Sequence, residues 1–503
     1  MRSTACIVLG CCCALAYAQG FNVVNLPANN AASRGASVRQ VSEGYLVFGD
    51  KYDADLVYRA HVELHGSDGA LIWERALVDA APSAFGYVDP VSPTVPDGGW
   101  AASIALNGTD TMTWRAYRFD AEGDTLWTTS LRTGYRVYPR AAVCQGDAYY
   151  YAALVQQHGS EVTKAVVARL NVPGELVQLV EFPTIAYDNL TLAAGTGTDL
   201  LMVGGRSGSS FPYRSVVMRL DSALNVIWTR DILTNMSGFS GYSSYVSKIT
   251  TDEDGDVLVG GTCYNEFVSS GIPYAEFYIL KLSRVNGNVI WTRRYPVSMS
   301  DWGSLNDLEH LPDGDMVSCG NVTPHDAAGF QGCIYRYAPD GTERWHRYYR
   351  FLTNPDAFND LKDVQPTTDG GFVLTGTTQL TLQFPTVLWL LRLDEHGCLE
   401  PGCQSVGVNE LLVGLPDDAM RCGPVPARDL LTVTINLPPD VELSGTMRLV
   451  ATDQAGRVVQ ETILPDRRSQ EMLIQVDTWG AGMYVIHLAD QARLLASRKI
   501  MVQ

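Results

Sequence analysis

After its first eighteen residues the chain has no apolar run approaching the ~18 residues that a membrane-spanning helix needs. It is also short of positive charge, because 37 Lys and Arg residues face 55 Asp and Glu residues, for a formal net charge of -18. Nucleic acids and anionic lipid surfaces are bound by basic patches, so this composition argues against both as partners. We expect an exported chain that is soluble and has no transmembrane segment.

Signatures of the common catalytic and nucleotide-binding sites are missing as well. The chain contains no GxSxG nucleophile elbow, no HExxH zinc motif and no phosphate-binding P-loop, and its 8 histidines are scattered. Carboxylates are abundant throughout an acidic chain, so their presence does not identify a glycosidase. We therefore assign no catalytic residues and no cofactor, and we favour a non-enzymatic role over an enzymatic one.

The amino terminus has the parts of a secretory signal peptide. Arg2 supplies a positive charge, an apolar stretch runs from Ala5 to Ala16, and Ala16-Tyr17-Ala18 offers small residues at the two positions that signal peptidase reads. The sequence predicts a signal peptide over residues 1–18. The alternative is lipoprotein processing at Cys11, which would leave a very short apolar region.

Four of the 11 cysteines lie within this predicted signal, and the remaining seven would reach an oxidising compartment. Cys319 and Cys333 bracket one segment and Cys398 and Cys403 bracket a shorter one, so each pair is a candidate local disulfide. The spacing completes no zinc-binding set. Three cysteines have no partner that spacing indicates: Cys144, Cys263 and Cys422.

An internal repeat fills the middle of the chain. Each copy has an apolar strand with a basic residue near its end, a turn containing Asp or Gly, and a short apolar segment that ends in Trp. Two degenerate copies carry Val177 and Cys398 near the Trp position, and the seven copies follow one another at intervals of 50 to 63 residues. The five complete copies end at Trp73, Trp127, Trp228, Trp291 and Trp345.

A second phrase lies between successive copies, a turn followed by a short apolar strand that ends in Gly, as in DEDGDVLVGG. Short strands alternating with Asp-Gly turns give four strands per copy, without a helical period. One four-stranded sheet cannot bury both of its faces, but seven sheets stacked radially can. The sequence predicts an all-β fold, with a seven-bladed β-propeller of roughly 54-residue repeats over residues 19–408. Six or eight blades are the error range.

The seventh copy has no clear fourth strand after Asp394. The segment FNVVNLP from Phe21 has no other assignment, so we expect it to supply this missing outer strand. The repeat resembles the Trp-containing units of PQQ-like, WD40-like and related bacterial propellers. It differs from the Asp-box of sialidases, which separates Gly from Trp by two residues, because three residues separate Gly341 from Trp345.

The Trp and the basic residue recur in nearly every copy, whereas a ligand site is needed once. We therefore interpret the Trp as packing between blades and the basic residue as a repeated hydrogen bond or ion pair. In the first copy Glu63 stands in the basic position. The basic residues of the other copies are Arg118, Arg169, Arg219, Lys281, Arg336 and Arg392.

Two clusters are weak candidates for metal ligands, and we assign a metal to neither. Period-two alternation places His61, Glu63 and His65 on one face of a strand, which suits a metal and equally suits a half-buried strand with incidental histidines. A predicted turn lacks the bidentate Glu of a full calcium loop, so a solvated hairpin turn is favoured there over calcium. Its three carboxylates belong to Asp252, Asp254 and Asp256.

The longest insertions are candidates for the rim of a ligand site at the channel mouth. They surround Tyr213, the pair Tyr264 and Tyr274, and His325. Aromatic residues in polar loops suit contact with a protein or a glycan, so the favoured function is a secreted binding scaffold for one of these. The alternatives are an extracellular polysaccharide hydrolase or lyase at the channel mouth and a PQQ-type dehydrogenase, for which no cofactor-binding phrase is present.

The last eighty or so residues contain four motifs in a fixed order: PVPARD, DQAGRVV, GAGMYV and KIMV. This order resembles the C-terminal sorting domain of proteins exported by the type IX secretion system. Val425-Pro426 stands where that family usually has Asn-Pro, which is a mild departure. The residues that match its motifs are Pro424, Pro426, Asp453, Gly456, Arg457, Gly482, Tyr484 and Lys499.

The resemblance implies a small Ig-like β-sandwich over residues 422–503, preceded by a linker at 409–421. Alternating apolar residues in these segments agree with roughly seven short strands. The resemblance also implies recognition by the type IX secretion machinery, with release or surface attachment afterwards. Together with the predicted signal peptide, it predicts secretion or display on the outer-membrane surface after passage through the periplasm. An ordinary accessory sandwich is the alternative.

Overall fold

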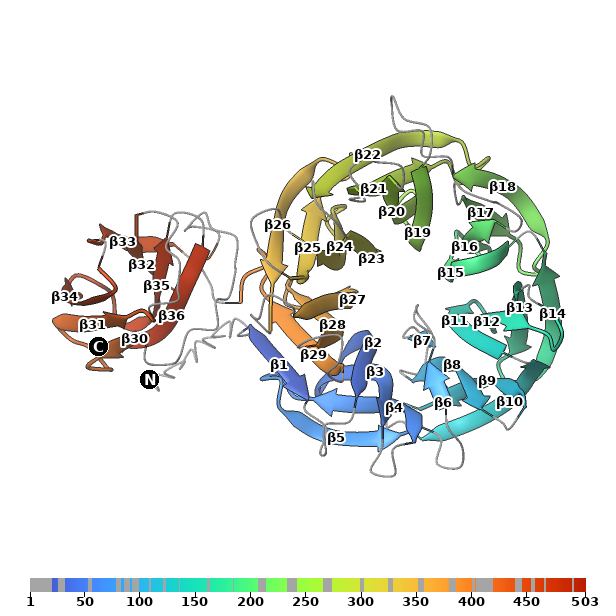
Figure 1. The fold of residues 1–503 in the computed structure, drawn as a ribbon, viewed down its shortest axis with the longest axis horizontal. Helices are drawn as coiled ribbons and strands as arrows, with labels where there is room; N and C mark the ends of the chain where they lie inside the picture. The colour runs from blue at the N-terminus through green and yellow to red at the C-terminus, as the bar shows by residue number, and fades with distance from the viewer. Residues whose placement is uncertain are drawn as a thin grey trace, which may run out of the picture.

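The computed structural model is built from β-strands, which form a ring of sheets and a separate small two-sheet domain (Figure 1). The predicted signal peptide, and the predicted linker up to residue 418, lie outside the described residues. No helix in the described part of the chain is long and apolar enough to cross a membrane. The structure describes residues 20–25, 32–52, 57–77, 83–85, 91–92, 99–107, 110–120, 124–134, 136–160, 163–183, 185–206, 214–232, 242–265, 274–298, 303–323, 329–351, 357–379, 386–399, 403, 419–438, 446–453, 457–465, 467–490 and 493–503.

Within these residues the ring has seven sheets, or blades, whose strands follow one another outward from the centre (Figure 1). Blade 1 comprises β2 (Ser33–Val41), β3 (Gly44–Tyr52), β4 (Tyr58–His65) and β5 (Leu71–Ala76). In blade 2, β6 (Ser83–Phe85) and β7 (Val91–Ser92) both pair with β8 (Trp100–Asn107), which β9 (Met112–Phe119) and β10 (Thr125–Gly134) follow. Blade 3 comprises β11 (Arg136–Gln145), β12 (Ala148–Gln156), β13 (Thr163–Asn171) and β14 (Leu176–Phe182).

The next three blades repeat this order. Blade 4 comprises β15 (Ile185–Ala194), β16 (Leu200–Arg206), β17 (Ser215–Leu220) and β18 (Val226–Ile232). Blade 5 comprises β19 (Tyr242–Thr251), β20 (Val257–Asn265), β21 (Tyr274–Leu282) and β22 (Val289–Ser298). Blade 6 comprises β23 (Gly303–His310), β24 (Met316–Val322), β25 (Gln331–Tyr337) and β26 (Glu343–Tyr349).

Blade 7 closes the ring with strands from both ends of the propeller. Its first three strands are β27 (Phe358–Pro366), β28 (Phe372–Gln379) and β29 (Val387–Leu393). Its fourth strand is β1 (Phe21–Asn25), which pairs with β29 from Phe21 opposite Arg392 to Asn25 opposite Leu388. The predicted closure by the segment at Phe21 is therefore confirmed.

The core of the propeller lies between the blades. At the interface of blades 4 and 5, for example, Val203 and Val217 of one blade form a buried cluster with Val259 and Leu282 of the next. A middle strand such as β24 is buried along its whole length, since it has a neighbouring blade on each side. A fourth strand such as β14 is half exposed. This difference explains why the phrases ending in Gly are continuously apolar.

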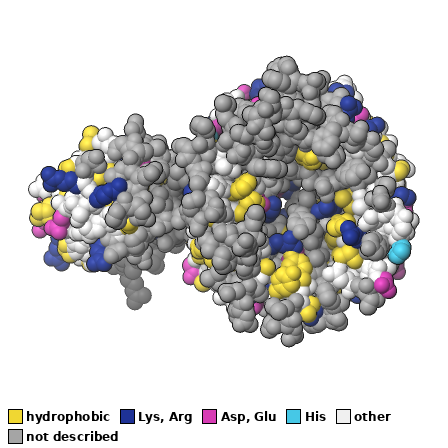
Figure 2. Space-filling model, viewed as in Figure 1, with side chains coloured by type: hydrophobic (Ala, Val, Ile, Leu, Met, Phe, Trp, Pro, Cys, Tyr) yellow, Lys and Arg dark blue, Asp and Glu magenta, His cyan; other side chains and the backbone are white. Residues whose placement is uncertain are grey.

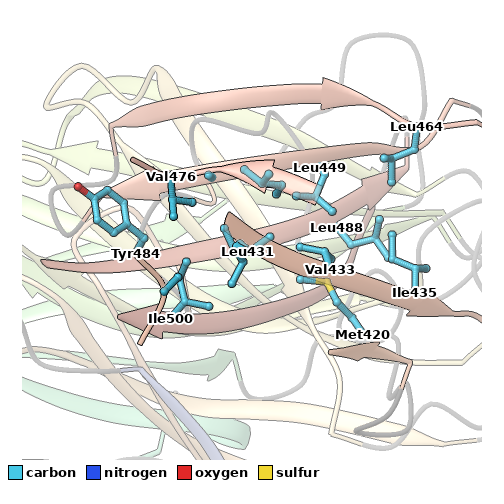
Figure 3. Close-up of a cluster of buried hydrophobic side chains, with 14 of the residues drawn as sticks. Met420, Leu431, Val433, Ile435, Leu449, Leu464, Val476, Tyr484, Leu488 and Ile500 are labelled. Atoms are coloured by element: carbon cyan, nitrogen blue, oxygen red, sulfur yellow. The ribbon is translucent and has the colours of Figure 1, made fainter. Parts of the chain in front are cut away.

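The carboxy-terminal domain packs two antiparallel sheets face to face, with the order β30-β31-β34 in one and β33-β32-β35-β36 in the other. Figure 3 shows its core, in which Leu431 and Val433 of the first sheet lie against Leu449, Leu488 and Ile500 of the second. The fold is an all-β, seven-bladed propeller followed by an Ig-like sandwich, as predicted. The sandwich strands are β30 (Met420–Gly423), β31 (Leu430–Asn436), β32 (Arg448–Asp453), β33 (Val458–Ile463), β34 (Ser469–Gln475), β35 (Gly482–Asp490) and β36 (Arg493–Val502).

Candidate functional site

The repeated tryptophans lie in the fourth strands and pack on a turn of the following blade. Trp228 Nε1 donates a hydrogen bond to the carbonyl of Arg284 (3.0 Å), and Trp127 makes the equivalent contact from the second blade. The turn has a glycine with positive φ under the ring, because a Cβ on Gly174 or Gly287 would lie 2.5 or 2.7 Å from an indole atom. The indoles therefore join neighbouring blades.

The expectation that Val177 stands at the tryptophan position of the third copy is wrong. Gln178 pairs with Arg169 across the strands, in the same register that the tryptophans have with their basic residues. Gln178 Nε2 donates a hydrogen bond to the carbonyl of Ala223 (3.0 Å), which reproduces the bond of the indole without its ring. The adjacent turn has Leu224 instead of glycine, with a φ of 60° and a buried side chain. The ring and the glycine have been lost together.

The expectation that Cys398 lies near the tryptophan position of the seventh copy is also wrong. Cys398 follows β29 in a turn, where its N–H donates a hydrogen bond to Asp394 Oδ1 (2.7 Å). Phe21 takes the tryptophan position instead, because it pairs with Arg392. Its ring lies over a turn of blade 1, where a Cβ on Gly69 would approach it to 2.8 Å. The closing contact of the ring thus repeats the contact of the other blades.

The recurrent basic residues form ion pairs with aspartates in the first turn of their own blade. Lys281 Nζ lies 2.5 Å from Asp252 Oδ2, and Arg392 Nη2 lies 2.5 Å from Asp369 Oδ1. The predicted repeated ion pair is therefore present in at least four blades. The other two pairs are Arg219–Asp199 and Arg336–Asp315.

The three carboxylates considered for calcium belong to such a turn. Asp252 Oδ1 accepts hydrogen bonds from the N–H groups of Asp254 (3.1 Å) and Asp256 (2.9 Å). Asp256 Oδ1 accepts one from the N–H of Arg284 (3.0 Å). Burial lowers the pKa of Lys281, but Asp252 and its neighbours outweigh this effect and raise it overall. These contacts are those of a capped hairpin turn, with a lysine as the cation.

The histidine face of β4 has a different composition from the one expected. The basic position of this blade holds Leu64 and not Glu63, because Leu64 is the residue opposite Trp73. His65 is fully occupied, since Nδ1 lies 3.0 Å from the carbonyl oxygen of Gly69 and Nε2 lies 3.0 Å from Glu63 Oε2. His65 is therefore positioned to orient Glu63 and not to bind a metal.

Glu74, on the neighbouring strand β5, joins His61 and Glu63 instead. Potential ligand atoms of these three side chains all lie within 4.8 Å of one another. Lys51 Nζ is also close, at 2.5 Å from Glu74 Oε2 and 3.9 Å from Glu63 Oε1. Burial lowers the pKa of His61, and the nearby Glu63 carboxylate offsets part of this effect.

Of the two candidate disulfides, only that between Cys398 and Cys403 is formed, with a Cα–Cα distance of 5.7 Å. The prediction that Cys319 bonds to Cys333 is wrong, because both are free thiols. They lie one position out of register on paired strands, so their side chains point to opposite faces of the sheet. Cys319 packs toward blade 7 and Cys333 toward blade 5. Burial raises the pKa of both thiols.

The first strands of the blades surround the centre of the ring, and they share a β-bulge at equivalent positions (Figure 1). The strand pairing shifts by one residue after Gly35 in β2, Val246 in β19, Leu305 in β23 and Leu361 in β27. Register shifts also occur in β11 and β15. Because a bulge changes the direction of the side chains around it, these positions determine what the channel wall presents.

Charged side chains next to these bulges connect four consecutive blades; we name Lys248, Asp307, Asp363 and Arg39 the channel chain. Lys248 Nζ lies 2.8 Å from Asp307 Oδ1, and Arg39 Nη1 lies 2.7 Å from Asp363 Oδ2. Each aspartate also accepts a hydrogen bond from a backbone N–H of the next blade, at 2.9 Å for Asp307 and 2.6 Å for Asp363. Sequence reasoning missed this chain, because its residues occur in dissimilar phrases.

Burial raises the pKa of the Asp363 carboxyl, but Arg39 and Lys248 outweigh this effect, so its pKa lies below the ordinary value. A general acid in glycoside hydrolysis needs the opposite shift, which keeps its proton near neutral pH. Asp363 is therefore a charged hydrogen-bond acceptor within the wall.

The predicted rim residues fall largely outside the description. Tyr213 and His325 lie outside the described residues, and Tyr264 and Tyr274 lie at the facing ends of β20 and β21. All three insertions join the second strand of a blade to the third, so they leave the ring at the same face. Figure 2 shows Lys and Arg side chains around the central opening on the face drawn, although the whole chain is acidic.

The sorting-domain motifs meet one another in the sandwich. Ala427, in the first motif, accepts a hydrogen bond from the N–H of Gln503 (2.9 Å) and donates one to the carbonyl of Met501 (2.8 Å). Asp453 and Arg457 form an ion pair across the second motif. The Tyr484 hydroxyl donates a hydrogen bond to the carbonyl of Gly480 (2.7 Å). The remaining motif residues are on or beside these strands, with Pro424 and Pro426 after β30, Gly482 opening β35, Lys499 in β36, and Gly456 outside the described residues.

Solved structures similar to the chain include two that resemble its propeller region only weakly. One is the β-propeller domain of the Trilobed protease from Pyrococcus furiosus, with 10% identity, coverage of 72% of this chain and 93% of that one, and a TM-score of 0.41. The other is a Penicillium chrysogenum alpha-L-arabinanase, with 11% identity, coverage of 76% and 99%, and a TM-score of 0.41. No curated protein matches the chain. The propeller fold therefore rests on the strand pairing of the chain itself.

The carboxy-terminal domain, in contrast, matches a family directly. Residues 423–503 match the secretion system C-terminal sorting domain, and the match covers all four motifs. Residues 423–503 thus form a secretion system C-terminal sorting domain, and the chain is a secreted β-propeller protein sorted by the type IX system.

Proposed function

We propose that this protein is a secreted or surface-displayed scaffold that binds an extracellular protein or glycan through one face of its propeller. The difference between the two faces of the ring carries this proposal. On one face, short turns join the first strand to the second and the third to the fourth. In these turns the N–H of Gly255 donates a hydrogen bond to the carbonyl of Asp252 (3.0 Å), and Gly314 and Gly370 make equivalent bonds. Such closed turns leave few groups for a ligand.

The other face carries the connections from second to third strands, which include all three of the long polar and aromatic insertions. Binding residues commonly lie on such loops, because a rigid scaffold can position them without depending on their sequence. The second candidate function, hydrolysis or lysis of a polysaccharide at the channel mouth, has less support. Asp363 is held as a carboxylate by Arg39, and a glycosidase would need a protonated partner.

A glycan array and a hydrolysis screen on the purified mature protein test this proposal. We expect binding to one ligand class without turnover. A variant with residues 207–213 replaced by Gly and Ser should lose this binding. The matched control is Val285→Ser, which changes a 70% exposed side chain in a turn of the opposite face and should bind as the parent does. Turnover of any glycan would falsify the proposal.

The sorting domain supports a second test in the native host. A chain that ends before residue 409 should keep a folded propeller and accumulate in the periplasm, since the resemblance assigns export to the tail. Cell fractionation measures this outcome. Arrival of the shortened chain at the surface would contradict the role proposed for the tail, and it would leave the binding proposal unaffected.

A further inference from the structure

One cluster on blade 1 serves neither the channel nor the repeated contacts. It comprises Lys51 on β3, His61 and Glu63 on β4, and Glu74 on β5. The cluster lies on the side of blade 1 that faces blade 7. This placement follows from Val47, which is opposite Glu63 in the sheet and packs in the same buried cluster as Leu390 of blade 7.

The two carboxylates of this cluster need a cation. Glu63 and Glu74 lie directly opposite each other on paired strands, and like charges in this arrangement destabilise a sheet. The Glu63 side chain is only 1% exposed, so its charge would be costly to leave without compensation. No other blade has two glutamates at these positions. Lys51 supplies one such cation, through its 2.5 Å contact with Glu74.

The same carboxylates and His61 also have the spacing of a metal site. His61 Nδ1 lies 3.6 Å from Glu63 Oε1, and the three potential ligand atoms lie within 4.8 Å of one another. Zinc binds imidazole nitrogen and carboxylate oxygen at about 2.0–2.2 Å, so its ligand atoms are separated by about 3–4 Å. Small side-chain rotations would therefore bring all three atoms onto one ion.

His65 provides the support that metal ligands usually have in proteins. Its Nε2 contacts Glu63 Oε2 at 3.0 Å, and its Nδ1 contacts the carbonyl oxygen of Gly69 at 3.0 Å. Glu63 is thus held by one oxygen while the other, Oε1, faces His61 and Lys51. Partners of this kind orient a ligand and raise the affinity of a site.

We propose that His61, Glu63 and Glu74 bind one divalent metal ion of the zinc class, and that the Lys51 ammonium takes the place of the ion when the metal is absent. Three protein ligands leave a fourth tetrahedral position for water. Exchange needs only the Lys51 side chain to move, because its backbone is paired with Arg59 in the sheet.

The test is calorimetric titration of the mature protein with zinc chloride after chelator treatment and dialysis, together with cobalt(II) absorption as a report of the coordination. We expect one equivalent of zinc. His61→Ala should lower the affinity by at least about 10–100-fold, the loss seen even when only a supporting partner of a metal ligand is removed. Lys51→Met should raise the affinity about tenfold, because a competing charge is removed.

The matched control is His396→Ala, which removes an exposed histidine that lies 3.7 Å from Glu395 but has no second carboxylate partner in the cluster. Its zinc affinity should equal that of the parent. Circular dichroism confirms that each variant is folded, and Glu74→Gln is the substitute if His61→Ala is not. Absence of zinc binding by the folded Lys51→Met protein, or full affinity in the folded His61→Ala and Glu74→Gln proteins, overturns the proposal.

Discussion

The blades of this propeller are joined in two different ways, one at the outer rim and one at the channel. At the rim, an aromatic ring of each fourth strand lies on a glycine turn of the next blade, as Trp228 lies on Gly287. At the channel, the joins are ionic and change from blade to blade, as in Lys248–Asp307 and Arg39–Asp363. The repeated contact is architectural, whereas the contact that does not repeat gives the channel wall its individual chemistry.

The comparison extends to how each kind of contact tolerates change. Between blades 3 and 4 the rim contact has lost its ring, and Gln178 keeps the hydrogen bond while Leu224 occupies the turn. An apolar contact can be rebuilt in this way, because many shapes fill the same volume. A buried ion pair has no such freedom, since removing one partner leaves the other charged and buried.

The largest expected effect therefore comes from breaking the channel chain. Asp363→Ala should lower the free energy of unfolding by about 3–5 kcal/mol, because Arg39 would lose its buried carboxylate partner. Urea unfolding followed by tryptophan fluorescence measures the loss. The control is Asp254→Ala, in an exposed turn, which should change stability little. A loss below about 1 kcal/mol for Asp363→Ala would mean that the ionic join is not structural.

Breaking the rim contact should have a smaller effect. Trp228→Ala removes a partly buried ring and the hydrogen bond to Arg284, and we expect a loss of about 2–4 kcal/mol. The same unfolding measurement applies. Gly287→Ala should also destabilise the protein, because its φ is 68° and a Cβ would lie 2.7 Å from the ring of Trp228. If Gly287→Ala were neutral, the ring and the turn would not be in close contact.

A double-mutant cycle sharpens the comparison at the altered rim. Gln178→Trp and Leu224→Gly should each destabilise the protein, the first by collision with Leu224 and the second by loss of a buried side chain. Together they recreate the contact of the other blades, so the double variant should be more stable than the sum of the single changes by about 1–2 kcal/mol. Strict additivity would show that the two departures are unrelated.

The smallest expected effect concerns pH. Because the pKa of Asp363 is lowered in the folded state, its ionised form contributes stability above its ordinary pKa of about 4. This contribution is lost as the pH falls through the lowered folded-state value. The stability difference between the parent and Asp363→Asn should therefore be constant from pH 7 to about pH 5 and shrink at lower pH. The rim variant Trp228→Ala should show no such change, and a parallel decrease in both would contradict the assignment to Asp363.

Much of the fold follows from periodic signals in the sequence. The recurrent Trp, the basic residue and the Asp-Gly turns predict seven blades, and the position of Phe21 predicts how the ring closes. Counting from the basic residue could also have found Gln178, since it follows Arg169 by the same interval that separates Arg219 from Trp228. The error at Val177 came from looking for an apolar residue where a side-chain hydrogen bond had been kept.

The candidate sites were less predictable, because they depend on which strands are neighbours. Alternation along β4 correctly places His61 and Glu63 on one face, but it cannot show that His65 is occupied or that Glu74 lies opposite. The same limit explains the error at Cys319 and Cys333. Their spacing fits a disulfide, whereas the register of β24 and β25 sends the two thiols to opposite faces.

The sequence by itself determined the all-β class, the number of blades and the sorting domain, because each is encoded in local patterns that recur or keep a fixed order. Only the tertiary structure decided the channel chain, the acidic pair with its lysine, and the fate of each cysteine. These features join residues of different strands or blades, such as Arg39 and Asp363, which are distant in the chain. Their contacts depend on strand register and ring closure, which no single stretch of sequence specifies.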